Sequence, residues 1–231
     1  MNLKTAFATL GLLGLAAFSS AQVTKVGSAY QFRLKLAAGT SYKYSMNIIQ
    51  KGTTTPGGGI AVKVPFSQKV VSITGDTATI TYSAGPIMLN GQPLSPKPSV
   101  GTAKMSRQGK VVGGSMAAGQ GVAVFPATPV MPGSSWSSDV PLGGMGASGG
   151  STAKATYRFV GVKNVGGKQV AELAVTVVGT GQTKVNGSGT TYVLLTDGAP
   201  WKSNLTIKIS GIQAQGTTAP AMTMQMAITR V

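Results

Sequence analysis

The chain contains no cysteine and no histidine, and only four of its 231 residues are acidic. Without cysteine, a disulfide framework, a thiol nucleophile and a cysteine-based zinc site are excluded. Without histidine, a Ser-His-Asp triad is excluded as well. The acids are Asp76, Asp139, Glu172 and Asp197, so a multi-carboxylate metal site would need most of them in one place. We therefore expect neither a metal site nor a cofactor.

The acids also offer little for general acid–base catalysis, which usually relies on histidine or on a tuned carboxylate. Asp76 follows a glycine and Asp197 precedes one, and both dipeptides are typical of turns. Glu172 falls on the solvent-facing side of a predicted strand. We expect a protein that is not an enzyme. An enzyme of unknown class, working with serine and lysine or with the few acids, is the alternative that the composition leaves open.

Long apolar runs are missing too, apart from one at the N-terminus. Lys4 precedes an apolar stretch at 5–18, which small residues at 19–21 follow, the order of a secretory signal peptide cleaved before Gln22. The stretch is shorter than the roughly 20 residues that a membrane-spanning helix needs. Residues 1–21 are thus predicted to be a signal peptide. We expect an exported protein of the periplasm or the extracellular space, without a lipid anchor on cysteine.

Apolar and polar residues alternate with a period of two along most of the remaining chain. Successive side chains of a strand point to opposite faces, so each such run has one core face and one solvent face. The runs lie at 30–36, 42–48, 62–67, 77–82, 171–177, 205–209 and 222–229. Turn-forming residues at 39–40, 75–76, 108–109, 166–167 and 197–198 punctuate them, as adjacent antiparallel strands require.

The pattern predicts an all-β protein with very little helix. We expect an antiparallel, strongly curved sheet (a half-barrel) or a β-sandwich of about ten strands, because no helix is visible that could connect parallel strands. Residues 22–231 suit a single β-rich domain. The Gly/Ser-rich stretch 142–151 could instead join two β halves, 22–141 and 152–231. We favour one continuous sheet.

The charge is the strongest positive signal, with 20 basic residues against four acids and a net charge of +16. One interpretation is a solubilising solvent face, in which lysines also protect sheet edges from aggregation. That interpretation does not explain the scarcity of acids, because a surface of mixed sign would be equally soluble. The other interpretation is a positive field for an anionic partner. The candidate residues for it are Arg33, Lys35, Lys43, Lys63, Lys69 and Lys208.

In an exported protein, the anionic partner would be lipid head groups, cell-envelope polysaccharide or extracellular nucleic acid. Stacking on bases needs aromatic side chains interleaved with basic ones on the same surface. Here the alternation places Tyr30, Phe32, Tyr42 and Tyr44 on the face opposite the neighbouring basic residues. Specific binding of nucleic acid is therefore disfavoured, and anionic lipid or polysaccharide is the preferred partner.

Methionine is unusually common, with ten in the chain, and Met222, Met224 and Met226 alternate along the last predicted strand. Their side chains share one face, where methionine fills irregular gaps or lines an adaptable apolar groove. The first reading is a core strand. The second is a cavity for a lipid or acyl chain inside a curved sheet, with Trp136 as a further lining residue. A copper site is disfavoured, because such sites generally recruit histidine or cysteine.

The stretch Phe125–Trp136 (FPATPVMPGSSW) resembles a phrase found in exported bacterial β-rich domains of unknown function. In that family a Pro-x-x-Pro-Val-x-x-Gly-x-x-Trp stretch links two antiparallel halves. The segments 105–111 and 161–172 occur in the order that such domains show. The resemblance implies an antiparallel, strongly curved sheet and a non-enzymatic role. In fold alone, the predicted sheet is similar to periplasmic lipoprotein carriers and lipid-binding half-barrels.

Overall fold

A computed structural model describes residues 23–51, 60–95, 98–114, 124–141, 152–179, 184–211, 213–214, 217–218 and 221–231. The predicted signal peptide and the Gly/Ser-rich stretch 142–151 lie outside these residues. The described part contains strands and turns but no helix, which confirms the predicted all-β class. Every strand pair is antiparallel.

One 13-stranded sheet dominates the structure, and its path runs β10-β11-β12-β13-β14-β17-β3-β4-β5-β8-β9. The strands of this path are β3 (Ser41–Lys51), β4 (Ile60–Thr74), β5 (Thr77–Ala84), β8 (Ser99–Ser106), β9 (Val111–Gly114), β10 (Ser135–Pro141), β11 (Thr152–Val165), β12 (Lys168–Gly179), β13 (Lys184–Leu194), β14 (Pro200–Ser210) and β17 (Met222–Arg230). The C-terminal strand β17 lies between β14 and β3. It therefore joins the strands of the N-terminal half to those of the C-terminal half.

Short strands lie beside this path. β6 (Ile87–Leu89) pairs with both β4 and β7 (Gln92–Ser95), while β1 (Val23–Val26) pairs with β2 (Ala29–Phe32), and β15 (Gln213–Ala214) with β16 (Thr217–Thr218). The structure thus has more strands than the ten or so that the alternation predicts. The difference arises because strands of two to four residues are too short to show a period in the sequence.

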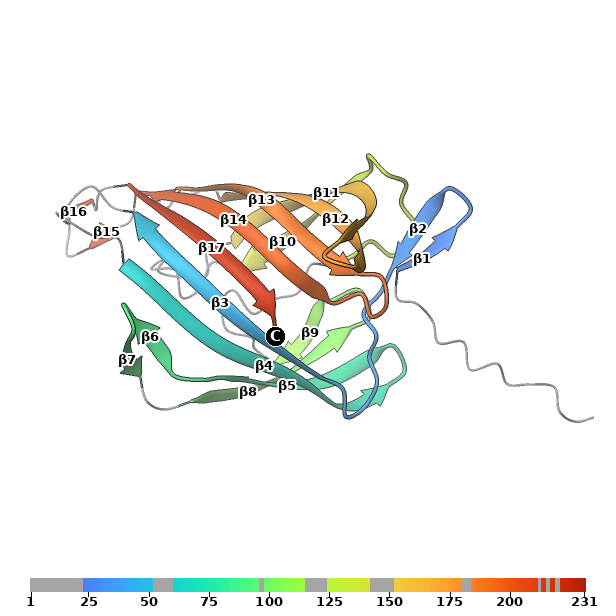
Figure 1. Cartoon of the computed structure of the whole chain (residues 1–231), viewed down its shortest axis with the longest axis horizontal. Coiled ribbons are helices and arrows are strands. Elements are labelled where there is room, and N and C mark those ends of the chain that lie inside the picture. The colour runs from blue at the N-terminus through green and yellow to red at the C-terminus, as the bar shows by residue number, and fades with distance from the viewer. Residues whose placement is uncertain are drawn as a thin grey trace, which may run out of the picture.

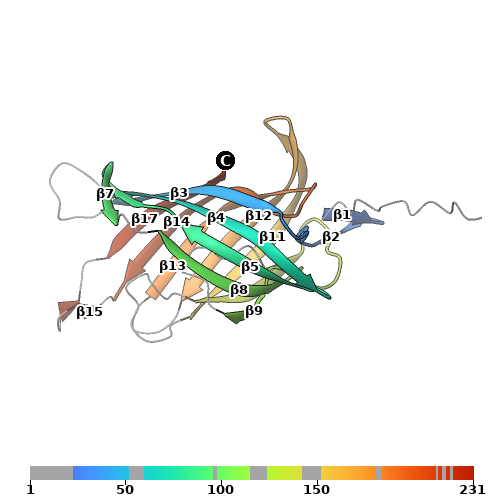
Figure 2. The ribbon, with the colours of Figure 1, turned by 90° about the horizontal axis from the view of Figure 1, so that it is seen from below.

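The large sheet is not closed, and β10 and β9 are its two ends. It nevertheless curves so strongly that it packs against itself. Val70 of β4 and Met105 of β8 share one buried cluster with Phe159 of β11 and Leu173 of β12, although several strands separate them in the sheet order. In Figure 1 the β11–β14 side lies above the β3–β8 side, and Figure 2 shows β5 and β8 in front of the opposite strands.

The N-terminal segment crosses one end of the curved sheet. The backbone N–H of Leu34 donates to the carbonyl of Arg107, and that of Lys35 donates to the carbonyl of Asp197. These carbonyls belong to turns on opposite sides of the molecule, after β8 and after β13. On the edge side, the Trp136 indole N–H donates to the Val124 carbonyl over 2.6 Å. The N-terminal segment and the loop that precedes β10 therefore connect the two sides of the sheet at this end.

Aromatic side chains fill the interior at the same end. Phe32 lies at the centre, with ring centroids 5.1 Å from Phe159, 5.5 Å from Phe125 and 5.9 Å from Trp136. The Tyr30 and Phe159 rings pack edge to face, with their centroids 5.3 Å apart. Phe32 and Phe159 are fully buried. The burial of these large aromatic surfaces contributes strongly to stability.

Candidate binding surfaces

Most of the few acids form ion pairs within the chain. Three ion pairs join Asp76 to Arg107, Glu172 to Lys163 and Asp197 to Arg230. The fourth acid, Asp139 on β10, lies directly opposite Lys154 on β11. None of the strands β3, β4, β5, β8, β13, β14 and β17 contains an acid. Arg230 of β17 is paired with Asp197, but the exposed lysines of β3, β4, β8, β13 and β14 face solvent with no carboxylate on the same strands to neutralise them.

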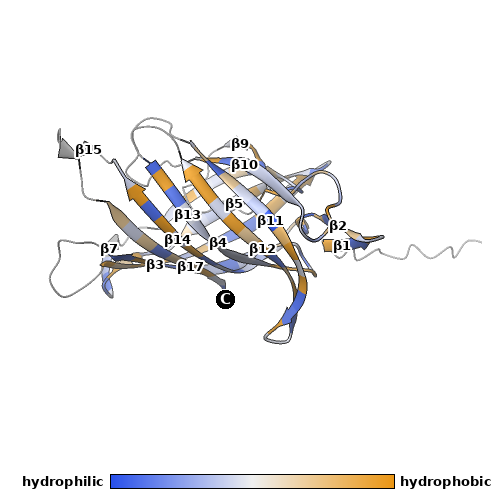
Figure 3. Ribbon diagram, turned by 90° about the horizontal axis from the view of Figure 1, so that it is seen from above, coloured by the Kyte–Doolittle hydropathy of each residue, from blue (hydrophilic) through white to orange (hydrophobic). Residues whose placement is uncertain are grey.

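Four of the predicted anion-binding residues lie on the outer, convex side of the sheet. Lys43, Lys63, Lys69 and Lys208 are exposed and alternate with buried or half-buried inward-facing residues. The alternation of apolar and polar residues along the strands is visible in Figure 3. The period of two in the sequence correctly predicted that these lysines face solvent, because successive side chains of a strand point to opposite faces.

Arg33 and Lys35 are also exposed, but they lie elsewhere. The alternation predicts a strand over 30–36, whereas β2 ends at Phe32 and the chain continues as an extended segment across the end of the sheet. The alternation persists in this segment because Leu34 and Leu36 are buried against the core. A period of two in the hydropathy shows only that one side of an extended chain is buried. A single extended segment can satisfy this pattern without being paired to a neighbouring strand.

Sequence reasoning missed Lys51 and Lys184. Both are exposed on the outer face, Lys51 at the end of β3 and Lys184 at the start of β13. Lys51 lies opposite Thr223 of β17, and Thr223 lies opposite Lys208 of β14. The alternation along each strand predicts that these lysines face outward. No sequence signal reveals that the C-terminal strand brings Lys51 and Lys208 into the same cross-strand row.

The three predicted methionines line the inner, concave side of the sheet. Met222, Met224 and Met226 lie opposite Ile209, Ile207 and Leu205 of β14, and all three are half-buried. They pack against a small buried cluster at the end of the sheet away from the aromatic cluster. Trp136 instead belongs to the aromatic cluster, where its ring stacks on Tyr157 at 5.8 Å. The structure therefore does not bring Trp136 together with the methionines.

A polar hollow of about 250 Å³ lies where β17 ends beside the start of β3. Its lining includes Lys35, Asp197 and Arg230, and the Arg230 guanidinium lies 4.7 Å from the centre of the Tyr42 ring. The Asp197 carboxylate also accepts a hydrogen bond of 2.9 Å from the Ala199 N–H. Arg230 and Asp197 form an ion pair across the hollow. This ion pair has a structural role, because it connects β17 to the β13–β14 turn.

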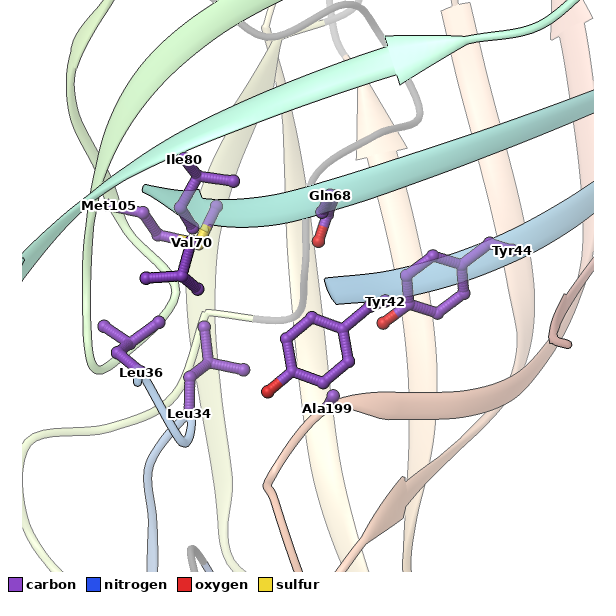
Figure 4. Close-up of a pocket in the computed structure, with 9 residues that line it drawn as sticks. All are labelled: Leu34, Leu36, Tyr42, Tyr44, Gln68, Val70, Ile80, Met105 and Ala199. Carbon is purple, nitrogen blue, oxygen red and sulfur yellow. The ribbon is translucent and has the colours of Figure 1, made fainter. Parts of the chain in front are cut away.

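Tyr42 and Tyr44 point into the interior beside this hollow, with Gln68 near them (Figure 4). The Tyr42 hydroxyl donates to the Lys35 carbonyl over 2.9 Å. The Tyr44 hydroxyl is buried and has no hydrogen-bond partner among the described residues. Burial raises the pKa of Tyr42 to about 12 and also raises the pKa of Tyr44. The space that these residues enclose measures only about 10 Å³, the lower limit for one water molecule.

The two tyrosines provide a matched pair of variants. Tyr44→Phe should raise the free energy of unfolding by about 1 kcal/mol, because it removes a buried hydroxyl that makes no hydrogen bond. Tyr42→Phe should lower it by about 1 kcal/mol, because it removes the bond to the Lys35 carbonyl while keeping the ring below Arg230. Urea denaturation of both variants measures the two changes. A loss of stability in Tyr44→Phe would show that the hydroxyl has a partner, such as a trapped water.

The chain matches no family model, and no curated protein is significantly similar to it. Among the described residues there is no helix long and apolar enough to cross a membrane. The same residues contain no group of three or more acids that could hold a metal ion. The geometry of the two faces of the sheet therefore carries the functional argument alone.

Proposed function

We propose that the protein is an exported, non-catalytic binding or structural protein of the cell envelope or the extracellular space, and that its basic outer face binds an anionic surface. One observation carries the proposal: three of the four acids form ion pairs and the fourth lies opposite Lys154, while β3, β4, β8, β13 and β14 present exposed lysines and no acid. The outer side of these strands therefore carries lysines without the acids that would form neutral pairs with them.

Such an arrangement favours binding over solubility as the reason for the charge. Lysines that only keep a protein in solution work equally well when acids are interspersed among them. A face of one sign produces a positive potential that attracts anionic partners and accelerates their association. The physical cost is mutual repulsion between the lysines, and an anionic partner relieves that repulsion.

The test compares one polymer in a charged and an uncharged form. The mature protein should bind immobilised polygalacturonate and elute with salt, and it should not bind the fully methyl-esterified polymer, because the ester removes the negative charge. Vesicles containing phosphatidylglycerol form a second anionic arm, with phosphatidylcholine vesicles as their neutral control. Equal retention on charged and neutral matrices, or retention that salt does not affect, would contradict the proposal.

A second candidate function rests on the concave face. Met222, Met224 and Met226 are only half-buried, whereas inward-facing residues at the other end of the sheet, such as Phe159 and Leu173, are fully buried. A half-buried apolar strip of flexible side chains is suited to hold a lipid or acyl chain. In this proposal the protein is a carrier of an apolar ligand.

Native mass spectrometry of protein purified from its own envelope tests the carrier function. A carrier should show additional mass that corresponds to a lipid, and Met224→Gln should remove that mass without unfolding the protein, because the residue is half-buried. Met131→Gln is a matched control, since Met131 is 55% exposed and lies far from β17 in the sequence. A ligand-free spectrum for the wild type would contradict this function.

A further inference from the structure

The strand register builds a polar row across the convex face. Lys208 of β14 lies opposite Asn186 of β13 on one side and Thr223 of β17 on the other, and Thr223 lies opposite Lys51 of β3. Neighbouring strands are about 4.8 Å apart, so the backbones at Lys208 and Lys51 lie about 10 Å apart with a threonine between them. The row therefore presents two ammonium groups separated by a hydroxyl, with an amide at one end.

More lysines flank the row. Lys184 is two residues before Asn186 on β13, about 7 Å along the strand. Lys63 of β4 lies opposite Asn47 of β3. Both lysines are exposed on the same face as the row. Lys184 is displaced along β13 from the row, and Lys63 lies on the next strand at a position four residues along β3 from Lys51, so further positive charges surround the row.

Most of the remaining outward-facing residues of these strands carry hydroxyl or amide groups. A second row consists of Ser188, Thr206 and Gln225, which lie opposite one another on β13, β14 and β17. The exceptions on β13, β14, β17 and β3 are Tyr192, Leu194, Ala227 and Ile49, together with Trp201, whose ring centroid lies 4.5 Å from the Lys202 ammonium group. Surfaces that bind membranes combine basic groups with large apolar ones that enter the head-group region. Beside the row this face has one exposed large apolar residue, Ile49, and its convex shape would touch a flat bilayer only along a narrow strip.

We propose that this face binds a linear acidic polysaccharide that runs across strands β13, β14, β17 and β3. The inference rests on the proposed function and specifies its partner. The acid groups of the sugar chain accept hydrogen bonds from the Lys208 and Lys51 ammonium groups. Sugar hydroxyls bond to Thr223 and Asn186, which can both donate and accept. A flexible chain can follow the curvature of the sheet, so several of these contacts form at once.

Two double variants with equal loss of charge separate the row from the general field. Lys51→Ser with Lys208→Ser removes both ammonium groups of the row. Lys69→Ser with Lys104→Ser is the control, because these exposed lysines lie on β4 and β8 and are also separated by one strand, β5. The probe is a decamer of galacturonic acid, and isothermal titration calorimetry gives its Kd. Thermal denaturation of each variant confirms that it is folded.

The row variant should weaken binding of the decamer at least 10-fold, and the control should weaken it less than 3-fold. Equal losses in the two variants would overturn the row while leaving the proposed function intact. Binding to phosphatidylglycerol vesicles without binding to the decamer would identify lipid as the partner and would also overturn the inference alone. Absence of binding to both probes would overturn the proposed function together with the inference.

Discussion

Replacing Phe159 with alanine should lower the free energy of unfolding by about 3–5 kcal/mol, the usual effect of truncating a buried phenylalanine. Phe159 is fully buried and lies 5.1 Å from Phe32 and 5.3 Å from Tyr30 between ring centroids. These partners belong to the N-terminal segment, whereas Phe159 belongs to the sheet. The alanine would leave a cavity between the two, because a close-packed interior collapses only partly around a lost ring.

Urea denaturation measures this change, and the next residue supplies the control. Val160 is 48% exposed, so Val160→Ala should change the free energy of unfolding by less than about 0.5 kcal/mol. A loss below about 1 kcal/mol in Phe159→Ala would show that the N-terminal segment does not close the end of the sheet as described. In that case Tyr30 and Phe32 would not be packed against the interior.

Binding to an acidic polymer should depend steeply on salt. If three or four lysines each neutralise one acid group, the affinity should fall roughly 50-fold between 50 and 200 mM salt, by the counterion-release rule that holds for polyanions. Calorimetric titrations of the galacturonic acid decamer at several salt concentrations give the slope of log affinity against log salt. The slope of Lys51→Ser/Lys208→Ser should be smaller than that of the wild type, by about one for each lost contact.

The same series distinguishes the two faces of the sheet. An apolar ligand on the concave side would bind with an affinity that hardly changes with salt, since no charge is neutralised there. A flat salt dependence for the decamer would show that the outer lysines make no direct contact with it. The steepness of the slope therefore reports the number of lysines engaged, independently of the variants.

The fold class and the direction of most side chains could be predicted from the sequence because they depend on local periodicity. Lys43, Lys63, Lys69 and Lys208 are on the solvent side, as the alternation requires, and the Met222–Met226 run faces the interior. The turns were predictable from another local property: Gly75, Gly109 and Gly198 adopt positive φ values that glycine permits at little cost.

The neighbours of each strand could not be predicted in this way. β17 lies between β14 and β3, and its pairing with β3 joins residues separated by most of the chain. Periodicity predicts which face of the sheet a lysine occupies, but it does not predict which residue of the neighbouring strand lies beside that lysine. Lys51 and Lys208 consequently form a row that only the register reveals. Trp136 and Met224 are both inward-facing and apolar, yet they belong to different clusters for the same reason.

Lysine footprinting tests the central claim most directly. The protein is labelled with an amine-reactive reagent with and without the galacturonic acid decamer, and mass spectrometry gives the modification at each lysine. We predict strong protection of Lys51 and Lys208, with weaker protection of Lys63 and Lys184. Lys168, which is exposed at the β11–β12 turn, should react equally in both samples. Equal protection of all lysines, or protection that spares Lys51 and Lys208, would contradict the account.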